Sequence, residues 1–479
     1  MCDVAGPSTA GVIALNAIGA QDVHLVTEDI EKSIFNYTET RHTDYTRFYR
    51  TTQVDNRTQE KYWPFRDNGT TVKVTLNPQM MGDLLANMYL LVELPRSLYS
   101  RNVGNSLIKS ISFRVDQLEV EKIYDDWQVI YNEMYLEPSE KSANEYLLNR
   151  MLYPVSTVRD DEESIKNGLS ALSTIPTLVP LRFFFCRKYA QSEYDSNKPN
   201  RPYLPLCAMH KQKIILEIEF HSMWFFSKPT TSFALGEPRF TQSTSFDFPT
   251  LNNFKIITEE ITLSEVDRLY YVKDKYNLLT NLVYKNSSAL SSLNSDAIKN
   301  NLVPSIPVKC IHWFVRRADY EYEEPVVMDI RDPLFPNEYT NYYVKDNVNI
   351  IDSRFRFEKI KSAKIYLNSL ELPNVSLADH NYFKYYIPLQ TRLTSPEKNI
   401  YTYSFSINPI NSESSGNLDF SQFNSDKTFL DVRMLSGNYS IDGYYKSNVA
   451  RLEQSYTLYV YYVGLNMFTF EDGFMRKAT

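Results

Sequence analysis

The amino-acid sequence predicts an all-β protein made of two consecutive antiparallel β-sandwiches, each with roughly eight strands. Three observations lead to this fold class. Strand-like alternation of apolar and polar residues recurs along the 479 residues, helical spacing is confined to two short segments, and one loop-like stretch divides the chain into similar halves. The high content of Tyr, Phe, Thr and Ile suits pleated, packed surfaces.

The predicted strands are recognised by the two-residue period of their apolar side chains. The clearest is Lys213–Phe220, where Leu216 and Ile218 share one face and Glu217 lies on the other. This pattern indicates a half-buried antiparallel strand. Met88–Leu94 is apolar throughout, which indicates a strand buried on both faces. Two further segments alternate like the first: Val72–Leu76 and Leu458–Val463.

Two helices are expected. The first carries Ile123, Trp127, Ile130 and Met134 at the spacing of one helix face, and Trp127 is expected to pack this helix onto a sandwich. The second begins at Ser264, with Asp267 as its capping-box partner, and continues to Thr280. Its apolar side is expected to face the core.

The best candidate for a domain boundary is a stretch rich in Pro, Ser and Thr near residues 226–250. We therefore predict an N-terminal arm at 1–30, a first sandwich at 31–225, a linker at 226–250 and a second sandwich at 251–479. No residue-level repeat links the halves, so only their similar layout suggests a duplication. The Ser- and Asn-rich segment Asn286–Asn301 is predicted to be an exposed loop.

Composition excludes several classes of protein. The chain has only 13 glycines and contains neither G-x-G-x-x-G nor G-x-x-x-x-G-K-[ST], so Rossmann enzymes, P-loop NTPases and protein kinases are excluded. A formal net charge of −7 argues against a nucleic-acid coat or a binder of anionic membranes. The four cysteines lie far apart, which indicates reduced, buried thiols; a Cys186–Cys207 disulfide is the less favoured alternative.

The N-terminal segment carries no sign of a targeting signal. Residues Met1–Glu31 contain no Lys or Arg, so no signal peptide is expected, and the apolar stretch Ala10–Ala20 is too short to cross a bilayer. Because the apolar side chains of this stretch need burial, we predict an arm that docks under a neighbouring molecule. The alternative is a frayed tail.

No catalytic, cofactor-binding or metal-binding residues are predicted. The six histidines are scattered, without the H-x-x-x-H or H-E-x-x-H spacing of a metal site. Paired acids such as Glu259 and Glu260 could hydrolyse glycosides if they flanked a cleft. Since neighbouring residues on a strand point to opposite faces, a solvated sheet edge is the favoured interpretation.

Glycosylation is the one modification for which the sequence offers a candidate. Asn286 is the preferred acceptor because its surroundings are the most loop-like. The N-x-[ST] sequons number about as many as chance would give, so they are weak signals. They begin at Asn36, Asn56, Asn68, Asn286, Asn374 and Asn438.

Several segments, taken in chain order, carry a family resemblance. Gly19-Ala20-Gln21-Asp22 is similar to an opening G-A-Q-D signature, and Met88–Pro95 to an M-Y-L-x-V-x-L-P strand. Tyr124–Glu133 is similar to a tryptophan-bearing helix, and Tyr401–Pro409 to a Y-x-Y-S-F block. Further matching segments are Arg41–Tyr45, Gly82–Leu85, Val179–Leu181, Leu204–Leu206, Pro307–Lys309 and Ser415–Ser421.

Together these segments resemble the double jelly-roll major capsid proteins of nucleocytoplasmic large DNA viruses. The departures are Asp44 and Asp419, where relatives carry Asn, and a divergent C-terminus after Gly464. The resemblance implies two consecutive eight-stranded antiparallel jelly-roll sandwiches with a few short helices in loops. Pro95, Pro180, Pro205 and Pro409 are expected at strand ends, where a missing N–H does least harm.

The function implied by the resemblance is structural and not enzymatic. Three copies of the chain would form a homotrimer of pseudo-hexagonal outline, and many such trimers would tile an icosahedral shell. Each trimer would contact neighbouring capsomers and minor capsid or penton proteins. The arm at residues 1–30 would lie at the inner surface, near an internal membrane, and no direct contact with nucleic acid is expected. The location implied is the virion capsid, assembled in the host cytoplasm.

Two alternatives remain open at the level of sequence. One is a related scaffold or minor capsid protein, which shares the fold but is rare in mature particles. The other is a glycan-binding or glycan-hydrolysing β-sandwich protein, which would need a cleft with paired acids and exposed aromatic side chains.

Overall fold

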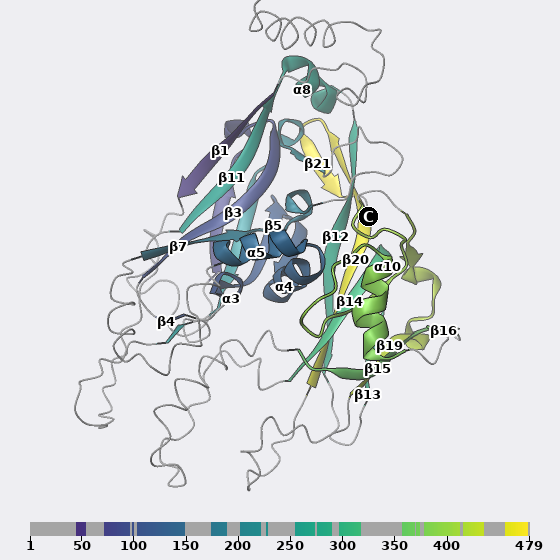
Figure 1. Ribbon diagram of the computed structural model, residues 1–479. Coiled ribbons are helices and arrows are strands. Elements are labelled where there is room, and N and C mark those ends of the chain that lie inside the picture. The colour runs from purple at the N-terminus through teal and green to yellow at the C-terminus, as the bar shows by residue number, and fades with distance from the viewer. Residues whose placement is uncertain are drawn as a thin grey trace, which may run out of the picture.

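The protein folds into two antiparallel β-sandwiches that lie side by side (Figure 1). Among the described residues, the two hydrophobic cores hold side chains from both sheets of each sandwich. The computed structural model of the chain describes residues 45–53, 71–95, 98–99, 103–148, 174–188, 202–221, 227–228, 254–273, 275–289, 297–317, 357–368, 370–373, 378–411, 415–434 and 456–477.

The first sandwich packs a sheet of order β1-β11-β3-β7 against a sheet of order β2-β9-β5-β6. The short strand β8 adds to β3, and β4 pairs separately with β10. The bounds are β1 Tyr45–Gln53, β2 Thr71–Leu76, β3 Leu84–Pro95, β4 Leu98–Tyr99, β5 Ile108–Val115, β6 Leu118–Tyr124, β7 Thr174–Pro180, β8 Leu204–Pro205, β9 Ile214–Phe220, β10 Ser227–Lys228 and β11 Phe254–Leu263.

The second sandwich packs a sheet of order β12-β20-β14-β17 against a sheet of order β13-β19-β15-β16. Two short strands extend the first of these sheets, since β18 pairs with β14 and β21 with β20. The bounds are β12 Tyr276–Ala289, β13 Ala297–Asn301, β14 Pro307–Arg317, β15 Ile360–Leu367, β16 Leu370–Leu372, β17 Tyr401–Ser404, β18 Leu418–Asp419, β19 Thr428–Met434, β20 Tyr456–Glu471 and β21 Phe474–Lys477.

Both sandwiches follow the same path through space. When the main strands of each are counted from one to eight along the chain, one sheet has the order 1-8-3-6 and the other 2-7-4-5 in both halves. This is the order of a jelly roll, and its repetition gives the protein two rolls of one topology. The predicted fold class is confirmed. The two halves share their strand order although no residue-level repeat links their sequences.

The boundary between the rolls differs from the predicted one. Strand β11 follows the predicted linker at 226–250, yet it pairs with β1 and β3 and is the eighth strand of the first roll. Residues 254–263 therefore belong to the first sandwich, not the second. Composition alone could not show that the strand after the Pro- and Ser-rich stretch returns to the first roll, because that depends on which strands it pairs with.

Helices are short and lie outside the sheets. They comprise α3 Val103–Leu107, α4 Asp125–Met134, α5 Pro138–Leu147, α8 Glu265–Val272 and α10 Ile387–Gln390, with a π-helical turn at Tyr382–Tyr386 and 3₁₀ turns at Pro78–Met80, Phe184–Cys186, Leu206–Met209, Phe420–Gln422 and Ser425–Lys427. Among the described helices, none has the length and apolar character needed to cross a bilayer.

The two predicted helices have different outcomes. Helix α4 is confirmed with Trp127, Ile130 and Met134 buried, but Ile123, predicted on the same helix face, lies in strand β6. Helix α8 begins where expected, since the Asp267 amide donates to the Ser264 hydroxyl at 3.3 Å. It ends at Val272 rather than Thr280, and none of its residues is buried, so its predicted core-facing side is wrong. Strand β12 begins at Tyr276 because its backbone pairs with β20.

The predicted strands form in the described parts of the chain, but two predicted burial patterns are wrong. The segment Leu458–Val463 in β20 does not alternate and is buried almost throughout, and β3 is not buried on both faces. Strand β9 alternates buried and half-buried residues as its sequence predicts, and β2 alternates buried and exposed ones. In β3, one face is fully buried, while Tyr89 and Leu91 on the other face remain half-exposed. Pro95, Pro180 and Pro205 are the last residues of their strands, as predicted, whereas Pro409 lies in a turn five residues after the end of β17.

Candidate functional site

The described residues with the strongest chemistry lie where the two rolls meet. Helix α4, which follows β6 of the first roll, faces β12, β14 and β20 of the second roll (Figure 1). The larger hydrophobic core is continuous across this boundary, because it joins first-roll residues such as Trp127 to Val283, Phe314 and Tyr461 of the second roll. The junction is therefore a shared core rather than a surface contact between two independent domains.

Asp126 is the central charged group of the junction. Its carboxylate is fully buried and accepts a short hydrogen bond from the Arg316 guanidinium, which is also buried. The Lys285 ammonium lies 3.2 Å from the same carboxylate, and the Tyr461 hydroxyl donates to it at 3.4 Å. All three partners belong to the second roll, so one first-roll side chain holds β12, β14 and β20 together.

Glu121 on β6 makes a second charged link. It accepts a short hydrogen bond from Arg187, and it accepts the backbone N–H groups of Phe184 at 2.9 Å and Val283 at 3.1 Å. Arg187 also donates to the Asn281 carbonyl at 2.8 Å. Val283 and Asn281 lie on β12, so this pair fixes the first strand of the second roll to the first roll.

A third link consists of neutral groups. The Tyr135 hydroxyl, just after α4, lies 2.7 Å from Nε2 of His312 on β14. Burial lowers the pKa of His312 to about 3, so the imidazole is neutral at pH 7. Burial also raises the pKa of the neighbouring Cys310 thiol to about 12, so this group is neutral as well.

Aromatic packing surrounds these polar groups. The Trp127 ring stacks on Tyr461 with centroids 6.0 Å apart and lies 6.1 Å from His312. The Arg187 guanidinium lies over the same indole, 5.4 Å from its centroid. Trp127 therefore packs its helix onto the second roll, a more specific role than the sequence predicted.

Lowering the pH is expected to weaken the junction through His312. The unfolded chain binds a proton to this residue near pH 6.5, whereas the folded chain binds it only near pH 3. The free energy of unfolding should therefore fall by up to about 5 kcal/mol as the pH drops through this window. Denaturant unfolding at a series of pH values measures this slope. His312→Phe should flatten it, whereas substituting the half-buried His380 should change it less; equal slopes in all three proteins would contradict the assignment.

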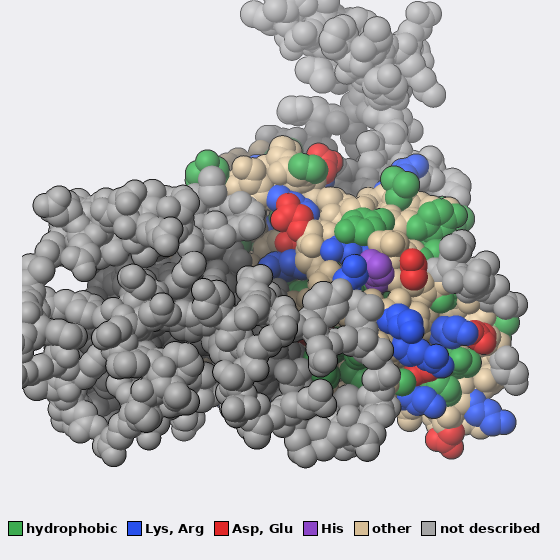
Figure 2. All heavy atoms as spheres, turned by 60° about the horizontal axis from the view of Figure 1, so that its bottom comes forward, with side chains coloured by type: hydrophobic (Ala, Val, Ile, Leu, Met, Phe, Trp, Pro, Cys, Tyr) green, Lys and Arg blue, Asp and Glu red, His purple; other side chains and the backbone are tan. Residues whose placement is uncertain are grey.

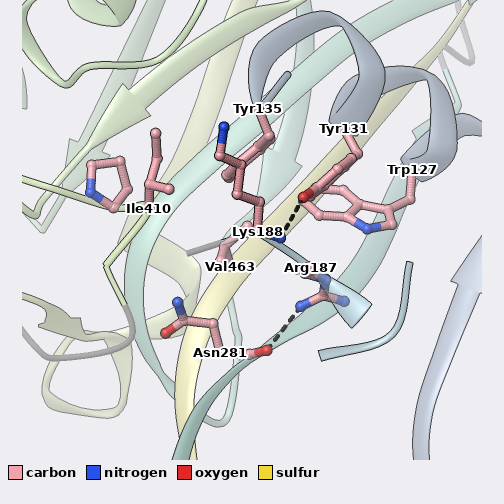
Figure 3. A pocket seen from close by; sticks show the side chains of 9 residues that line it. Trp127, Tyr131, Tyr135, Arg187, Lys188, Asn281, Ile410 and Val463 are labelled. Carbon is pink, nitrogen blue, oxygen red and sulfur yellow. Dashed lines mark hydrogen bonds between the residues drawn. The ribbon is translucent and has the colours of Figure 1, made fainter. Parts of the chain in front are cut away.

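A small pocket opens beside the junction (Figure 3). Its cavity volume is about 10 Å³, room for roughly one water molecule and far below the size of a small-molecule site. Most of its polar groups already have partners, because the Tyr131 hydroxyl accepts the Lys188 amide at 2.8 Å and Arg187 binds Asn281 and Glu121. The exception is the Trp127 indole nitrogen, a single buried donor, which is not the convergent set of polar groups that a glycan site needs.

Glu259 and Glu260 do not form the solvated edge that the sequence predicted. Both side chains are buried, and the pairing of β11 with β3 shifts register between them, so they do not simply alternate faces. Glu259 pairs with Arg47. Glu260 accepts from Arg50 at 3.0 Å and from the Gly82 amide at 2.7 Å. These ion pairs join β1 to β11, and neither acid flanks the pocket described above.

Removing the charge of Glu260 is expected to destabilise the first roll. In Glu260→Gln the amide still fills the site, but Arg50 and Thr258 lose charge-assisted hydrogen bonds to a buried carboxylate. The expected loss is about 2 kcal/mol of unfolding free energy, measured by urea denaturation. Glu219→Gln, at a partly exposed carboxylate on β9, is the control and should change stability by less than 1 kcal/mol.

Asn286 does not lie in a loop. It is part of β12, pairs with Val460, and its amide nitrogen donates to the Asn301 carbonyl at 3.1 Å. The segment predicted as a loop over Asn286–Asn301 begins with the end of β12 and finishes with β13. Ser and Asn are unusual in strands, which is why the sequence pattern was misleading. Glycosylation of Asn286 remains a prediction, with less favourable surroundings.

Other candidate residues are placed as follows. Cys186, Cys207 and Cys310 are buried and none of the three forms a disulfide, so the alternative Cys186–Cys207 disulfide is not found. His221 is buried with its Nε2 atom 3.0 Å from the Asp125 carboxylate. Within the described ranges, no group of three or more His, Cys, Asp or Glu side chains could hold a metal ion. The arm at 1–30, His24, His42, Cys2 and the acids near residue 321 lie outside the described residues.

The sequence did not reveal the charged links at the junction. Asp125 and Asp126 precede a buried tryptophan, a position that usually indicates a helix N-terminus. Arg316 ends an apolar strand, where a charged residue usually marks the exit to solvent. The available signal was a charged residue beside an otherwise apolar run, such as Arg316. The sequence alone could not identify its partner, Asp126, because the two residues are 190 positions apart.

Comparison with known proteins identifies the family. Residues 50–243 match the family model for the N-terminus of major capsid proteins, and residues 265–476 match the model for the major capsid protein of large eukaryotic DNA viruses. The two matches adjoin β11 and α8, where the structure places the change from one roll to the next.

Individual relatives agree with these matches. The chain is 27% identical over 228 residues to probable capsid protein 4 of Acanthamoeba polyphaga mimivirus, covering 44% of this chain and 38% of that protein. It is 23% identical over 328 residues to capsid protein 1 of the same virus, covering 65% of this chain and 49% of that protein. The matched regions span about half or less of the length of these relatives.

Solved structures share the fold. A subunit of the PBCV-1 virus capsid superposes with a TM-score of 0.61 at 16% identity, over 93% of this chain and all of that one. The Faustovirus major capsid protein gives a TM-score of 0.58 at 11% identity, over 95% of this chain and 97% of that one. With both halves matched in order, the chain belongs to the family of major capsid proteins of large eukaryotic DNA viruses.

Proposed function

We propose that the protein is the shell-forming subunit of an icosahedral virion. Three chains would associate into a homotrimer, and each chain would contribute two jelly rolls of one topology, so the trimer would have a pseudo-hexagonal outline. The observation that carries this proposal is the pair of rolls with identical strand order, fixed side by side by the Asp126 and Glu121 links. A chain whose rolls could rotate freely would not present a constant outline to its neighbours.

The surface suits contacts between such trimers. Figure 2 shows Lys and Arg side chains gathered on part of the described surface, interspersed with acidic ones. Mixed polar surfaces favour weak, correctable contacts, whereas obligate interfaces within an oligomer are more apolar. The neighbours would be other capsomers and minor capsid or penton proteins, with an internal membrane near the arm at 1–30. Direct contact with nucleic acid is not proposed, in keeping with the net charge of −7.

The proposed role is structural, without catalysis, and the proposed location is the virion capsid after assembly in the host cytoplasm. A related scaffold or minor capsid protein would share this fold. Quantifying the chain in purified virions distinguishes these roles, because a major capsid protein is the most abundant shell component and a scaffold is sparse.

Sedimentation of the purified chain tests the trimer. The expected mass is three times 56.0 kDa, about 168 kDa, and electron microscopy should show particles of six-sided outline. A species that remains at 56.0 kDa at every concentration, with intact secondary structure, would contradict the proposal. A glycan array and a glycoside hydrolase assay should both be blank.

A further inference from the structure

Helix α8, which connects the two rolls, presents apolar side chains to solvent. Val266, Leu269 and Tyr270 are 75%, 52% and 70% exposed, and their spacing places them on one stripe of the helix. The helix is fixed by other contacts: the Ser264 cap and an ion pair of 3.2 Å between Arg268 and Asp83. A stripe of large apolar side chains on a rigid, capped helix indicates a surface that another segment covers.

The N-terminal segment of the same chain enters the described structure beside this helix. Strand β1 begins at Tyr45, which pairs with Leu263, the residue directly before the Ser264 cap. Figure 1 shows the start of β1 and the end of β11 close to α8, at the end of the molecule away from β16. The 44 residues before Tyr45 are therefore tethered at the foot of the apolar stripe.

The composition of this segment complements the surroundings of α8. The stretch Ala10–Ala20 supplies apolar side chains, among them Val12, Ile13, Leu15 and Ile18. Residues 1–31 contain no Lys or Arg but carry Asp3, Asp22, Glu28, Asp29 and Glu31. Cations and acids both border the stripe: Lys273 and Lys275 are exposed beyond its C-terminal end, whereas Glu265 is exposed at its N-terminal end and Arg268 pairs with Asp83. The apolar centre of the segment matches the stripe, and the acidic residues that follow this centre match the two lysines.

We propose that Ala10–Ala20 docks in cis on the Val266, Leu269 and Tyr270 stripe of α8, with the acidic residues that follow it near Lys273 and Lys275. The 24 residues from Gln21 to Asp44 are long enough, at about 3.3 Å per residue when extended, to connect a docked Ala10–Ala20 segment to Tyr45 at the start of β1. A tether of this kind holds the segment at an effective concentration on the order of millimolar. This intrachain contact differs from the predicted docking under a neighbouring molecule.

Photocrosslinking of the full-length chain tests the contact. A photoreactive benzoylphenylalanine replaces Leu269, and the illuminated protein is digested and analysed by mass spectrometry. The expected crosslink joins this position to a peptide containing residues 10–20. The matched control carries the same group at Leu370 on β16, which is 54% exposed and far from α8, and should give no such crosslink.

Variants and mixing experiments make the assignment specific. Ile13→Asp combined with Leu15→Asp should reduce the crosslink at least tenfold, whereas Ser8→Asp, outside the apolar stretch, should leave it intact. Mixing isotopically heavy and light chains should give no heavy–light peptide pairs. The proposal would be overturned by a crosslink from position 269 to another segment or by a heavy–light peptide pair. The absence of any crosslink would also overturn it. The readout does not depend on trimer formation, so its failure is distinct from failure of the proposed capsid role.

Discussion

Replacing Asp126 by Asn is expected to lower the free energy of unfolding by about 3–5 kcal/mol. The substitution keeps the shape of the side chain but removes the buried negative charge that the Arg316 guanidinium and the Lys285 ammonium share. Removing one partner of a buried ion pair costs more than the pair itself contributes, and the link between the two rolls should weaken. Urea denaturation at constant protein concentration, followed by tryptophan fluorescence, measures the effect.

Two comparisons test whether the buried pair is responsible. Glu217→Gln removes one partner of a largely solvated pair with Lys73 and should change stability by less than 1 kcal/mol. Combining Asp126→Asn with Arg316→Met removes both charges, and this double variant should lose less stability than the sum of the single variants. Additive losses, or an Asp126→Asn effect no larger than that of Glu217→Gln, would show that the pair does not hold the junction.

The second large effect is expected for Trp127→Ala, also about 3–5 kcal/mol. Trp127 is 1% exposed and fills the space between α4 and the second roll, where Tyr461 and His312 pack against its ring. Its indole nitrogen has no hydrogen-bond partner among the described residues, so the substitution strands no polar group and the loss is one of packing. Thermal and urea unfolding both measure it.

The loss of stability should grow with the volume of the cavity that each substitution of Trp127 leaves. Trp127→Phe keeps an aromatic ring and should lose less stability than the alanine variant. Tyr146→Ala, at a side chain 61% exposed on the neighbouring α5, should change stability by no more than about 0.5 kcal/mol. Comparable losses at Trp127 and Tyr146 would mean that the helix does not couple the rolls.

Much of the fold could be predicted from local pattern. Alternation along β9 and β2, the helical spacing of α4 and the Ser264 cap of α8 each depend on residues within a few positions of one another. Ordered family signatures added the jelly-roll topology. In contrast, the boundary between the rolls depended on which sheet β11 joins. Strand β11 pairs with β1, and the paired residues are more than 200 positions apart in the sequence.

The errors share one physical cause. Asn286 has a loop-like sequence but lies in a strand because β20 pairs with β12 along its whole length. The acids Glu259 and Glu260 resemble a solvated edge, but Arg47 and Arg50 of another strand neutralise them in a buried position. In each case a partner distant in sequence overrode the local preference.

The sequence by itself determined that this protein is built of β-strands, where the clearest strands and helix α4 lie, and which family it resembles. Those properties follow from side-chain periodicity and ordered motifs, which are local. Only the tertiary structure decided where one roll ends, that Asp126 and Glu121 join the rolls through Arg316 and Arg187, and that α8 turns its apolar stripe outward. These are pairings between distant segments, and a charge or an apolar side chain does not carry in its own sequence the identity of the group that will face it.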